Sequence, residues 1–213
     1  LRDWPYERLK AATLADTQAH PNWSMGQRIT VDSASMFNKA MEIIETKEFF
    51  NVKPAQIEVI LHPESIIHSM VAYQDGAVMA HLGAPDMRHA IGYALHYPMR
   101  EKLPVPRLDF AALSQLNFKA PDLTRYPALR LAHEVMHQSG TFGAAFNAAK
   151  DVALDGFIAG QLGFMDMAPL VEETLSTLMQ SNSLKNAPLS LDDVAQSDHL
   201  AKTTARVLAQ KFS

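Results

Sequence analysis

The chain has 213 residues, 47% of them hydrophobic and 20% charged, which is ordinary for a folded globular protein and argues against long disordered stretches. A net charge of −4 offers no basic surface for nucleic acid or an acidic membrane, and no apolar run reaches the roughly 18 residues of a membrane span. The absence of cysteine excludes disulfides, thiolate metal sites and cysteine nucleophiles, and it favours a cytoplasmic location.

The first part of the chain predicts helices separated by a loop. The first residues lack the basic and apolar segments of a secretory signal, and Trp4–Glu7 begins a short helix with Pro5 in its first turn. The polar and aromatic run His20–Gly26 predicts a loop. An amphipathic pattern then predicts one helix over roughly Ser33–Phe50.

A β region follows. Three apolar runs predict strands: 57–61, 66–73 and 77–82. The Asp75-Gly76 pair between the last two is a strong signal for a hairpin turn. Asp86 is then expected to cap a helix that runs to about Tyr97.

The remainder predicts a linker and a helical bundle. Prolines are frequent between residues 98 and 127, so 98–124 is predicted to be a linker with one short strand near 116–118. Four helices are expected beyond it: 127–138, 142–161, 166–180 and 190–211. Short connections favour an antiparallel bundle. The predicted fold class is α+β, with a catalytic α/β portion and small mixed sheet over 1–97, the linker, and a helical bundle over 125–213.

One polar constellation suits an anion and a metal ion. On the predicted helix from Ser33, the spacing of Ser35, Asn38 and Glu42 places them on one face, with Lys39 close by. The start of a helix offers unpaired N–H groups and a partial positive charge, which suit phosphate. Glu42, one turn further on, suits a divalent cation or a hydroxyl. The alternative is an amphipathic helix with a solvated polar face.

A second motif, His133-Glu134-Val135-Met136-His137, matches the H-E-x-x-H pattern of zinc peptidases. Catalytic zinc usually needs three protein ligands, and Gly143 stands where the extended pattern has its third histidine. A zinc peptidase is therefore kept as an alternative function. A non-catalytic dimerisation module is the other alternative.

Several segments resemble 1-deoxy-D-xylulose 5-phosphate reductoisomerase. The most specific are His20-Pro21-Asn22-Trp23-Ser24-Met25-Gly26, Ile29-Thr30-Val31-Asp32-Ser33-Ala34 and Asn38-Lys39-x-x-Glu42. The resemblance continues through Leu61–Met70, Leu82–Arg88, Ala120–Asp122 and Phe146–Ala149. It implies an enzyme that makes 2-C-methyl-D-erythritol 4-phosphate in non-mevalonate isoprenoid biosynthesis, with NADPH and Mg²⁺ or Mn²⁺ as cofactors and a homodimeric state.

The resemblance also implies roles for individual residues. His20 would contact the substrate phosphate or backbone from a mobile loop, and Trp23 would close over the bound substrate. Ser33, Asn38 and Lys39 hold the substrate phosphate, and Glu42 ligates the metal ion. Gly26 approaches NADPH, with Met25 and Met87 near its nicotinamide, and His68 supports the site. The implied catalytic residues are His20, Lys39 and Glu42.

The resemblance further implies that parts of the enzyme precede this sequence. The sequence has no G-x-G pair and so builds no Rossmann phosphate turn of its own. The family has a Rossmann-type NADPH domain and further acidic metal ligands before the present first residue, so the 213 residues alone are expected to be inactive. Lys150-Asp151 also replaces the Asn-Glu expected after Ala149, which leaves the role of that position open.

Overall fold

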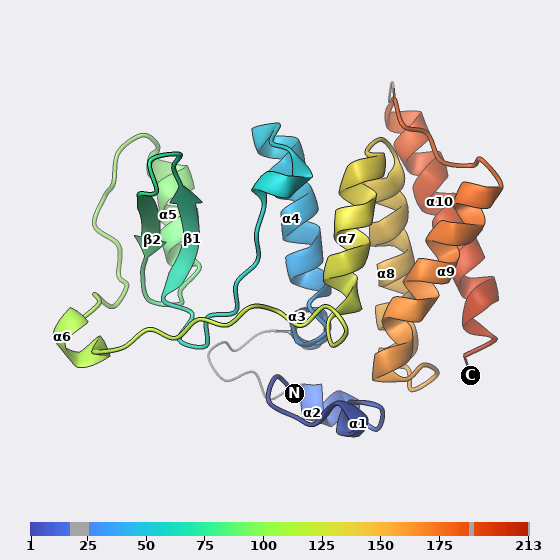
Figure 1. The fold of residues 1–213 in the computed structure, drawn as a ribbon, viewed down its shortest axis with the longest axis horizontal. Helices are drawn as coiled ribbons and strands as arrows, with labels where there is room; N and C mark the ends of the chain where they lie inside the picture. The colour runs from blue at the N-terminus through green and yellow to red at the C-terminus, as the bar shows by residue number, and fades with distance from the viewer. Residues whose placement is uncertain (18–25, 188–189, 213) are drawn as a thin grey trace. The chain divides into compact units, whose positions relative to one another are not determined.

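A computed structural model describes residues 1–17, 26–187 and 190–212 (Figure 1). The described chain forms two compact units. The helical unit contains residues 1–17, 26–58, 122–187 and 190–212, and the hairpin unit contains residues 59–121. None of the described helices is long and apolar enough to cross a membrane.

The helical unit begins with short helices and ends in a bundle. Its helices before the bundle are α1 (Tyr6–Leu9), α2 (Leu14–Thr17), α3 (Gln27–Ala34), α4 (Phe37–Phe50) and a 3-10 turn at Pro54–Gln56. The bundle consists of α7 (Pro127–Gln138), α8 (Phe142–Ile158), a 3-10 turn at Phe164–Asp166, α9 (Met167–Gln180) and α10 (Leu191–Ala209). All four predicted bundle helices are therefore present, with ends close to the expected ones.

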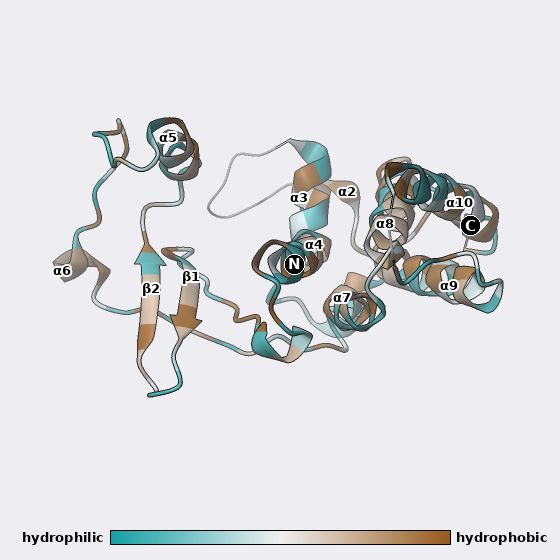
Figure 2. Ribbon diagram, turned by 90° about the horizontal axis from the view of Figure 1, so that it is seen from above, coloured by the Kyte–Doolittle hydropathy of each residue, from teal (hydrophilic) through white to brown (hydrophobic). Residues whose placement is uncertain are grey.

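The bundle core is made of side chains that are almost completely buried. Figure 1 shows α7, α8, α9 and α10 side by side, and α8 packs against both α9 and α10. Hydrophobic and hydrophilic segments alternate along α9, as an amphipathic helix requires (Figure 2). Leu131, Phe146, Leu154 and Leu170 are each no more than 1% exposed. Each such side chain contributes about 1.5–3 kcal/mol of burial free energy, which makes the bundle the main source of stability.

The predicted helix over Ser33–Phe50 is two helices, so that prediction was wrong. Met36 adopts the left-handed conformation, with φ 64° and ψ 12°, between α3 and α4. Ser35 Oγ donates to Val31 O at 2.9 Å and Asp32 O at 3.1 Å, which satisfies carbonyls at the end of α3. Side-chain hydrogen bonds of this kind compete with helix continuation.

α4 belongs to the helical unit because its buried face packs on the bundle. The Phe37 ring lies 5.8 Å from the ring of Phe146 in α8, and α4 also packs along α7. The sequence placed 33–50 in a domain over 1–97 with the hairpin. The compact units instead join this segment to the C-terminal helices and include most of the predicted linker 98–124 in the hairpin unit.

Two connections of the bundle are locked together at Gly140. Gly140 has φ +59°, and a Cβ atom there would lie 1.9 Å from Lys185 O. Next to it, Thr141 N donates to Lys185 O over 2.8 Å, and Lys185 N donates to Thr141 Oγ1 over 3.0 Å. The turn between α7 and α8 therefore closes directly on the loop that precedes α10.

The hairpin unit contains β1 (Ile67–Ala72), β2 (Val78–Leu82), α5 (Arg88–His96) and α6 (Phe110–Leu113). β1 and β2 pair antiparallel, from Ala72 opposite Val78 to Ile67 opposite Leu82, so the hairpin at Asp75-Gly76 is confirmed. Asp86 Oδ1 accepts from Arg88 N over 2.9 Å at the start of α5.

The sheet of the described chain has two antiparallel strands, and the predicted strand over 57–61 is absent from it. In that run only Leu61 pairs, in an isolated bridge to Lys119, just beyond the strand expected at 116–118. Without a neighbouring ladder, an apolar run alone does not make a strand. The α+β class is confirmed, but the small sheet is a hairpin and is not mixed.

Candidate functional site

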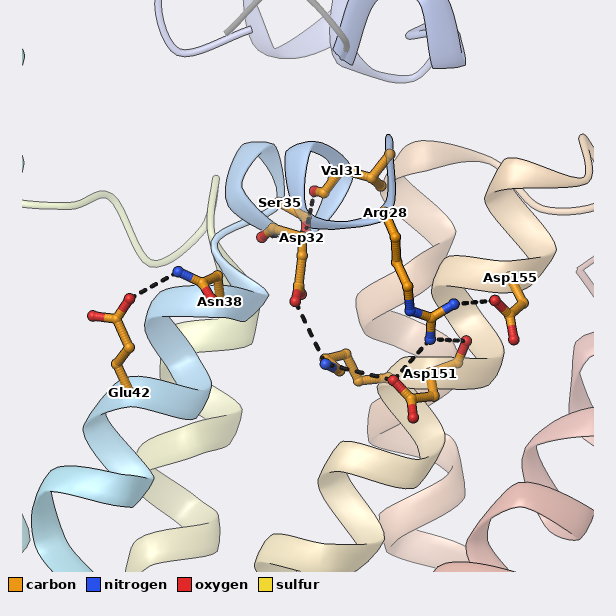
Figure 3. Close-up of polar contacts among 9 residues, drawn as sticks. Arg28, Val31, Asp32, Ser35, Asn38, Glu42, Asp151 and Asp155 are labelled. Atoms are coloured by element: carbon orange, nitrogen blue, oxygen red, sulfur yellow. Dashed lines mark hydrogen bonds and ion pairs between the residues drawn. The ribbon is translucent and has the colours of Figure 1, made fainter. Parts of the chain in front are cut away.

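The first two turns of α4 bring together an amide, an ammonium and a carboxylate. Asn38 Nδ2 donates to Glu42 Oε1 over 2.8 Å, and the Lys39 ammonium donates to Glu42 Oε2. Residues three and four apart share a helix face, so both donors converge on one carboxylate. Figure 3 shows Asn38 and Glu42 on the same side of α4. The Lys39 and Glu42 side chains are 39% and 44% exposed, so the cluster is within reach of a solvent-borne ligand.

The start of α4 has the electrostatics of an anion site. Its first turn has no acidic residue and no side-chain cap, and the first helical bond is donated by Ala40 N to Met36 O. The backbone N–H groups that precede this bond carry the partial positive charge of the helix start. Lys39 adds a full positive charge there, and together these positive charges favour the binding of an anion.

α4 begins at Phe37, four residues after the start that was predicted from the sequence. The prediction put Ser33 at the beginning of the helix, whereas Ser33 lies half-buried in the last turn of α3. The expected stack of Ser35 with Asn38 and Glu42 on one continuous helix is also wrong, because the left-handed Met36 separates them. The structure thus brings Asn38, Lys39 and Glu42 together and places Ser33 on the preceding helix.

A cluster of charged side chains, buried at Asp32 and Lys150 and exposed at Arg28 and Asp155, joins α3 to α8 beside this site. Lys150 Nζ lies 3.5 Å from Asp32 Oδ2 and 3.5 Å from Asp151 Oδ1. Arg28 binds Asp151 over 2.8 Å and also pairs with Asp155 (Figure 3). Sequence reasoning noticed Lys150-Asp151 as a departure from the family pattern but did not pair it with Asp32, which is 118 residues away.

Burial raises the pKa of the Asp32 carboxyl above its ordinary value, and the nearby Lys150 ammonium acts in the opposite direction. The Asp32 side chain is only 10% exposed, and its Oδ1 has no hydrogen-bond partner in the described part of the chain. A buried carboxylate with one charged partner depends strongly on that partner.

Glu42 offers one hard oxygen ligand to a divalent cation. Mg²⁺ is bound by about six oxygen atoms, several of them from water or substrate. Within residues 1–17, 26–187 and 190–212, no group of three or more His, Asp or Glu side chains is arranged to hold a metal ion. The described residues therefore fit part of a metal site and do not complete one.

The other expected site residues fall into two groups. His20, Trp23 and Met25 lie outside the described residues. Gly26 is exposed at the N-cap of α3, and a Cβ atom there would meet nothing within 4 Å. Its φ of −62° suits any residue, so neither packing nor backbone conformation requires glycine there. Met87, in the hairpin unit, is 59% exposed at the N-cap of α5.

The His68 ring contacts neighbouring residues of the hairpin unit. Its Nε2 lies 3.2 Å from Ser65 O, and its ring lies edge-on to the ring of His81 with centroids 5.4 Å apart. Burial, followed by the neighbouring His81, lowers the pKa of His68. A neutral imidazole is therefore favoured at this position.

The H-E-x-x-H segment lies on α7, as a zinc helix requires, but its glutamate is engaged elsewhere. Arg130 donates to Glu134 over 2.6 Å and to Glu172 over 2.8 Å. Among the described residues, His133 and His137 are not joined by a third His, Asp or Glu side chain in an arrangement that could hold a metal ion. The segment gives no support to the zinc peptidase alternative.

Comparison with known proteins identifies two family models. The model described as "DXP reductoisomerase C-terminal domain" matches residues 82–204. The model described as "1-deoxy-D-xylulose 5-phosphate reductoisomerase C-terminal domain" matches residues 1–50, which include the α4 cluster.

Curated relatives carry the same name. The 1-deoxy-D-xylulose 5-phosphate reductoisomerase of Ruegeria sp. (strain TM1040) is 64% identical over 201 residues, 94% of this chain and 51% of the relative. That of Jannaschia sp. (strain CCS1) is 62% identical over 205 residues, 96% of this chain and 52% of the relative. The chain thus spans about half the length of the curated relatives it matches.

Solved structures agree with this similarity. The 1-deoxy-D-xylulose 5-phosphate reductoisomerase from Zymomonas mobilis in complex with NADPH is 38% identical with a TM-score of 0.88, over 98% of this chain and 52% of that one. A DOX-P reductoisomerase in complex with NADPH, fosmidomycin and magnesium is 34% identical with a TM-score of 0.92, over the same shares. From the family models, the relatives and the α4 cluster together, the chain belongs to the 1-deoxy-D-xylulose 5-phosphate reductoisomerase family.

Proposed function

We propose that this chain is the C-terminal-domain portion of an NADPH-dependent enzyme that converts 1-deoxy-D-xylulose 5-phosphate to 2-C-methyl-D-erythritol 4-phosphate in isoprenoid biosynthesis. The observation that carries the proposal is the convergence of Asn38 and Lys39 on Glu42 at the start of α4. The names of the relatives support it, and so do the NADPH, fosmidomycin and magnesium of the solved structure described above.

The start of α4 is the proposed phosphate site. The Asn38 amide and the Lys39 ammonium supply side-chain donors in the first turn of the helix, whose backbone N–H groups have no side-chain cap. Hydrogen bonds from charged donors to phosphate are among the stronger ones in proteins. The hydroxyl of Ser33 is proposed as a further donor from α3. Binding energy from this remote phosphate orients the reacting part of the substrate and helps exclude water.

Glu42 is the proposed ligand of Mg²⁺ or Mn²⁺ in this chain. Its half-exposed carboxylate lies beside the phosphate donors, where the substrate's own oxygens would be presented. Substrate, water and other residues of the longer protein are proposed to complete the coordination. Bound NADPH would supply hydride, and the bound cation would polarise the oxygens of the substrate.

The remaining roles follow the family pattern. Gly26 is proposed to let NADPH approach the backbone closely, which gives a reason for glycine where the fold itself requires none. Met25 and Met87 are proposed to contact the nicotinamide, and His20 and Trp23 to contact and cover the substrate. A cytoplasmic homodimer is also proposed, and sedimentation of the full-length protein tests the oligomeric state.

The experiment uses the full-length protein. NADPH oxidation should require both 1-deoxy-D-xylulose 5-phosphate and Mg²⁺ or Mn²⁺, and fosmidomycin should inhibit it. Inorganic phosphate or fosmidomycin should also protect Lys39 from acetylation, measured by mass spectrometry, while leaving Lys10, at the C-cap of α1, reactive. Oxidation that does not depend on the substrate, or equal acetylation of Lys39 with and without ligand, would contradict the proposal.

A further inference from the structure

The ion pair between Asp32 and Lys150 is the most deeply buried charge pair in the described chain. Each side chain is only 10% exposed, and the Lys150 ammonium lies 3.5 Å from Asp32 Oδ2. Because Asp32 Oδ1 has no protein partner among the described residues, Lys150 is the main group that holds this carboxylate. A buried charge that loses its partner is strongly destabilising, because it is left uncompensated away from water.

Asp32 lies where it can fix the geometry of the proposed phosphate site. It directly precedes Ser33, and its carbonyl accepts a hydrogen bond from Ser35 Oγ. Ser33 O in turn accepts from Met36 N over 3.2 Å, and α4 begins at the next residue. A short chain of contacts therefore leads from Lys150 to the connection between α3 and α4.

The other link between α3 and α8 is weaker in physical terms. Arg28 reaches Asp151 and Asp155, but its side chain is 46% exposed and that of Asp155 is 68% exposed. Solvent and salt screen such pairs, so exposed pairs contribute little to stability. Arg28 also lies one turn earlier in α3 than Asp32 and so is further from Ser33.

We propose that Lys150 is a positioning residue for the phosphate site: by holding the Asp32 carboxylate it fixes the last turn of α3 and thereby the placement of Ser33 relative to Asn38 and Lys39. Lys150 itself touches neither substrate nor cofactor in this assignment. The inference rests on the proposed function, because it concerns the same phosphate site.

The test measures ligand affinity and thermal stability in the same full-length variants. The dissociation constant for fosmidomycin, with NADPH and Mg²⁺ present, and the Tm are determined for wild type, Lys150→Met and the double variant Asp32→Asn/Lys150→Met. Lys150→Met should weaken fosmidomycin binding about tenfold and lower the Tm, since outer groups that orient ligating residues typically contribute 10–100-fold. The KM for NADPH should change less than twofold, because Lys150 is assigned to the phosphate site alone.

The double variant separates positioning from simple stabilisation. Removing both charges removes the uncompensated carboxylate, so the Tm should recover toward that of wild type. The link from α8 to the last turn of α3 stays lost, so fosmidomycin binding should remain weak. Lys202→Met is the matched control: Lys202 on α10 pairs with Asp198 at 2.9 Å and is 34% exposed, and its loss should leave fosmidomycin binding unchanged.

Wild-type affinity in Lys150→Met, or recovery of both Tm and affinity in the double variant, would overturn the assignment. If Lys150→Met does not fold, the double variant decides alone, since wild-type affinity there refutes the positioning role and weak affinity supports it. If the wild-type protein itself fails to bind fosmidomycin, the proposed function fails. Binding by wild type and the variants alike refutes only the role of Lys150.

Discussion

The Asn38 amide donates to the Glu42 carboxylate over 2.8 Å, one helical turn further along α4. Because Asn38 lies in the first turn of the helix and Glu42 in the second, the contact links the proposed phosphate site to the proposed metal ligand. A substitution at Asn38 is therefore expected to affect metal binding at Glu42, and a substitution at Glu42 is expected to affect phosphate binding.

Glu42→Gln in the full-length protein should lower turnover by at least about 10–100-fold, the effect typical of a group that orients or binds a metal. The amide can still accept from Asn38, but it loses the charge that favours a divalent cation. NADPH affinity should change little. Steady-state kinetics and NADPH titration check both. Glu45→Gln, at an exposed position three residues further along α4, is the control, and unchanged turnover in Glu42→Gln would remove Glu42 from the metal site.

Lys39→Met should weaken fosmidomycin binding by about 10–100-fold, which corresponds to the roughly 1.5–3 kcal/mol of a hydrogen bond to a charged group. Isothermal titration measures the affinity. The matched control is Lys10→Met, since Lys10 also pairs with a glutamate three residues away, at 2.8 Å on α1. Equal affinities in the two variants would mean that Lys39 does not contact the phosphonate.

The pH dependence of stability should differ between wild type and Asp32→Asn. Burial raises the pKa of Asp32 in the folded protein above its ordinary value of 3.8. At pH values between 3.8 and the raised pKa, the Asp32 carboxyl is more often protonated in the folded state than in the unfolded state. The stability that this group contributes is therefore present at low pH and is lost as the pH rises through the raised pKa.

This loss is at most about 1.4 kcal/mol per pH unit for one group. Denaturation of the full-length proteins at a series of pH values gives the difference between the two curves, in which the other carboxylates cancel. The wild-type curve should fall relative to that of Asp32→Asn as the pH increases. Parallel curves would show that Asp32 titrates normally.

Gly140→Ala should destabilise the protein by at least about 2 kcal/mol, because it combines a strained backbone with a steric clash. The new Cβ would lie 1.9 Å from Lys185 O, so the loop before α10 would have to move. Gly160→Ala is the control: its φ of +71° is also positive, but nothing lies within 4 Å of its Cβ position. If the two variants lose equal stability, the close approach to Lys185 has no energetic consequence.

The helical bundle was predictable because its signals are local. Pro127 begins α7, Gly140 follows its end, and Ser190 caps α10 by accepting from Asp193 N over 3.2 Å. The hairpin was predictable for the same reason, since Asp-Gly specifies its turn. These features depend on residues only a few positions apart.

The features that were missed depend on residues distant in sequence. Methionine carries no signal for the left-handed conformation, so nothing in the sequence around Met36 indicated the break between α3 and α4. The pairing of Asp32 with Lys150 requires α3 and α8 to be packed together first. The cluster of Asn38, Lys39 and Glu42 was predictable because its three- and four-residue spacings do not depend on where the helix begins. The predicted position of Ser33 was wrong because it did depend on the helix start.

The left-handed residue Met36 has a consequence for how ligand specificity can evolve. In one continuous helix the distance between Ser33 and Asn38 would be invariant, whatever surrounds it. With two helices, their mutual inclination also depends on the other helices that pack on each, which are α2 and α8 for α3 and α7 and α8 for α4. Substitutions in the bundle can therefore widen or narrow the spacing between the hydroxyl and the amide without altering either residue.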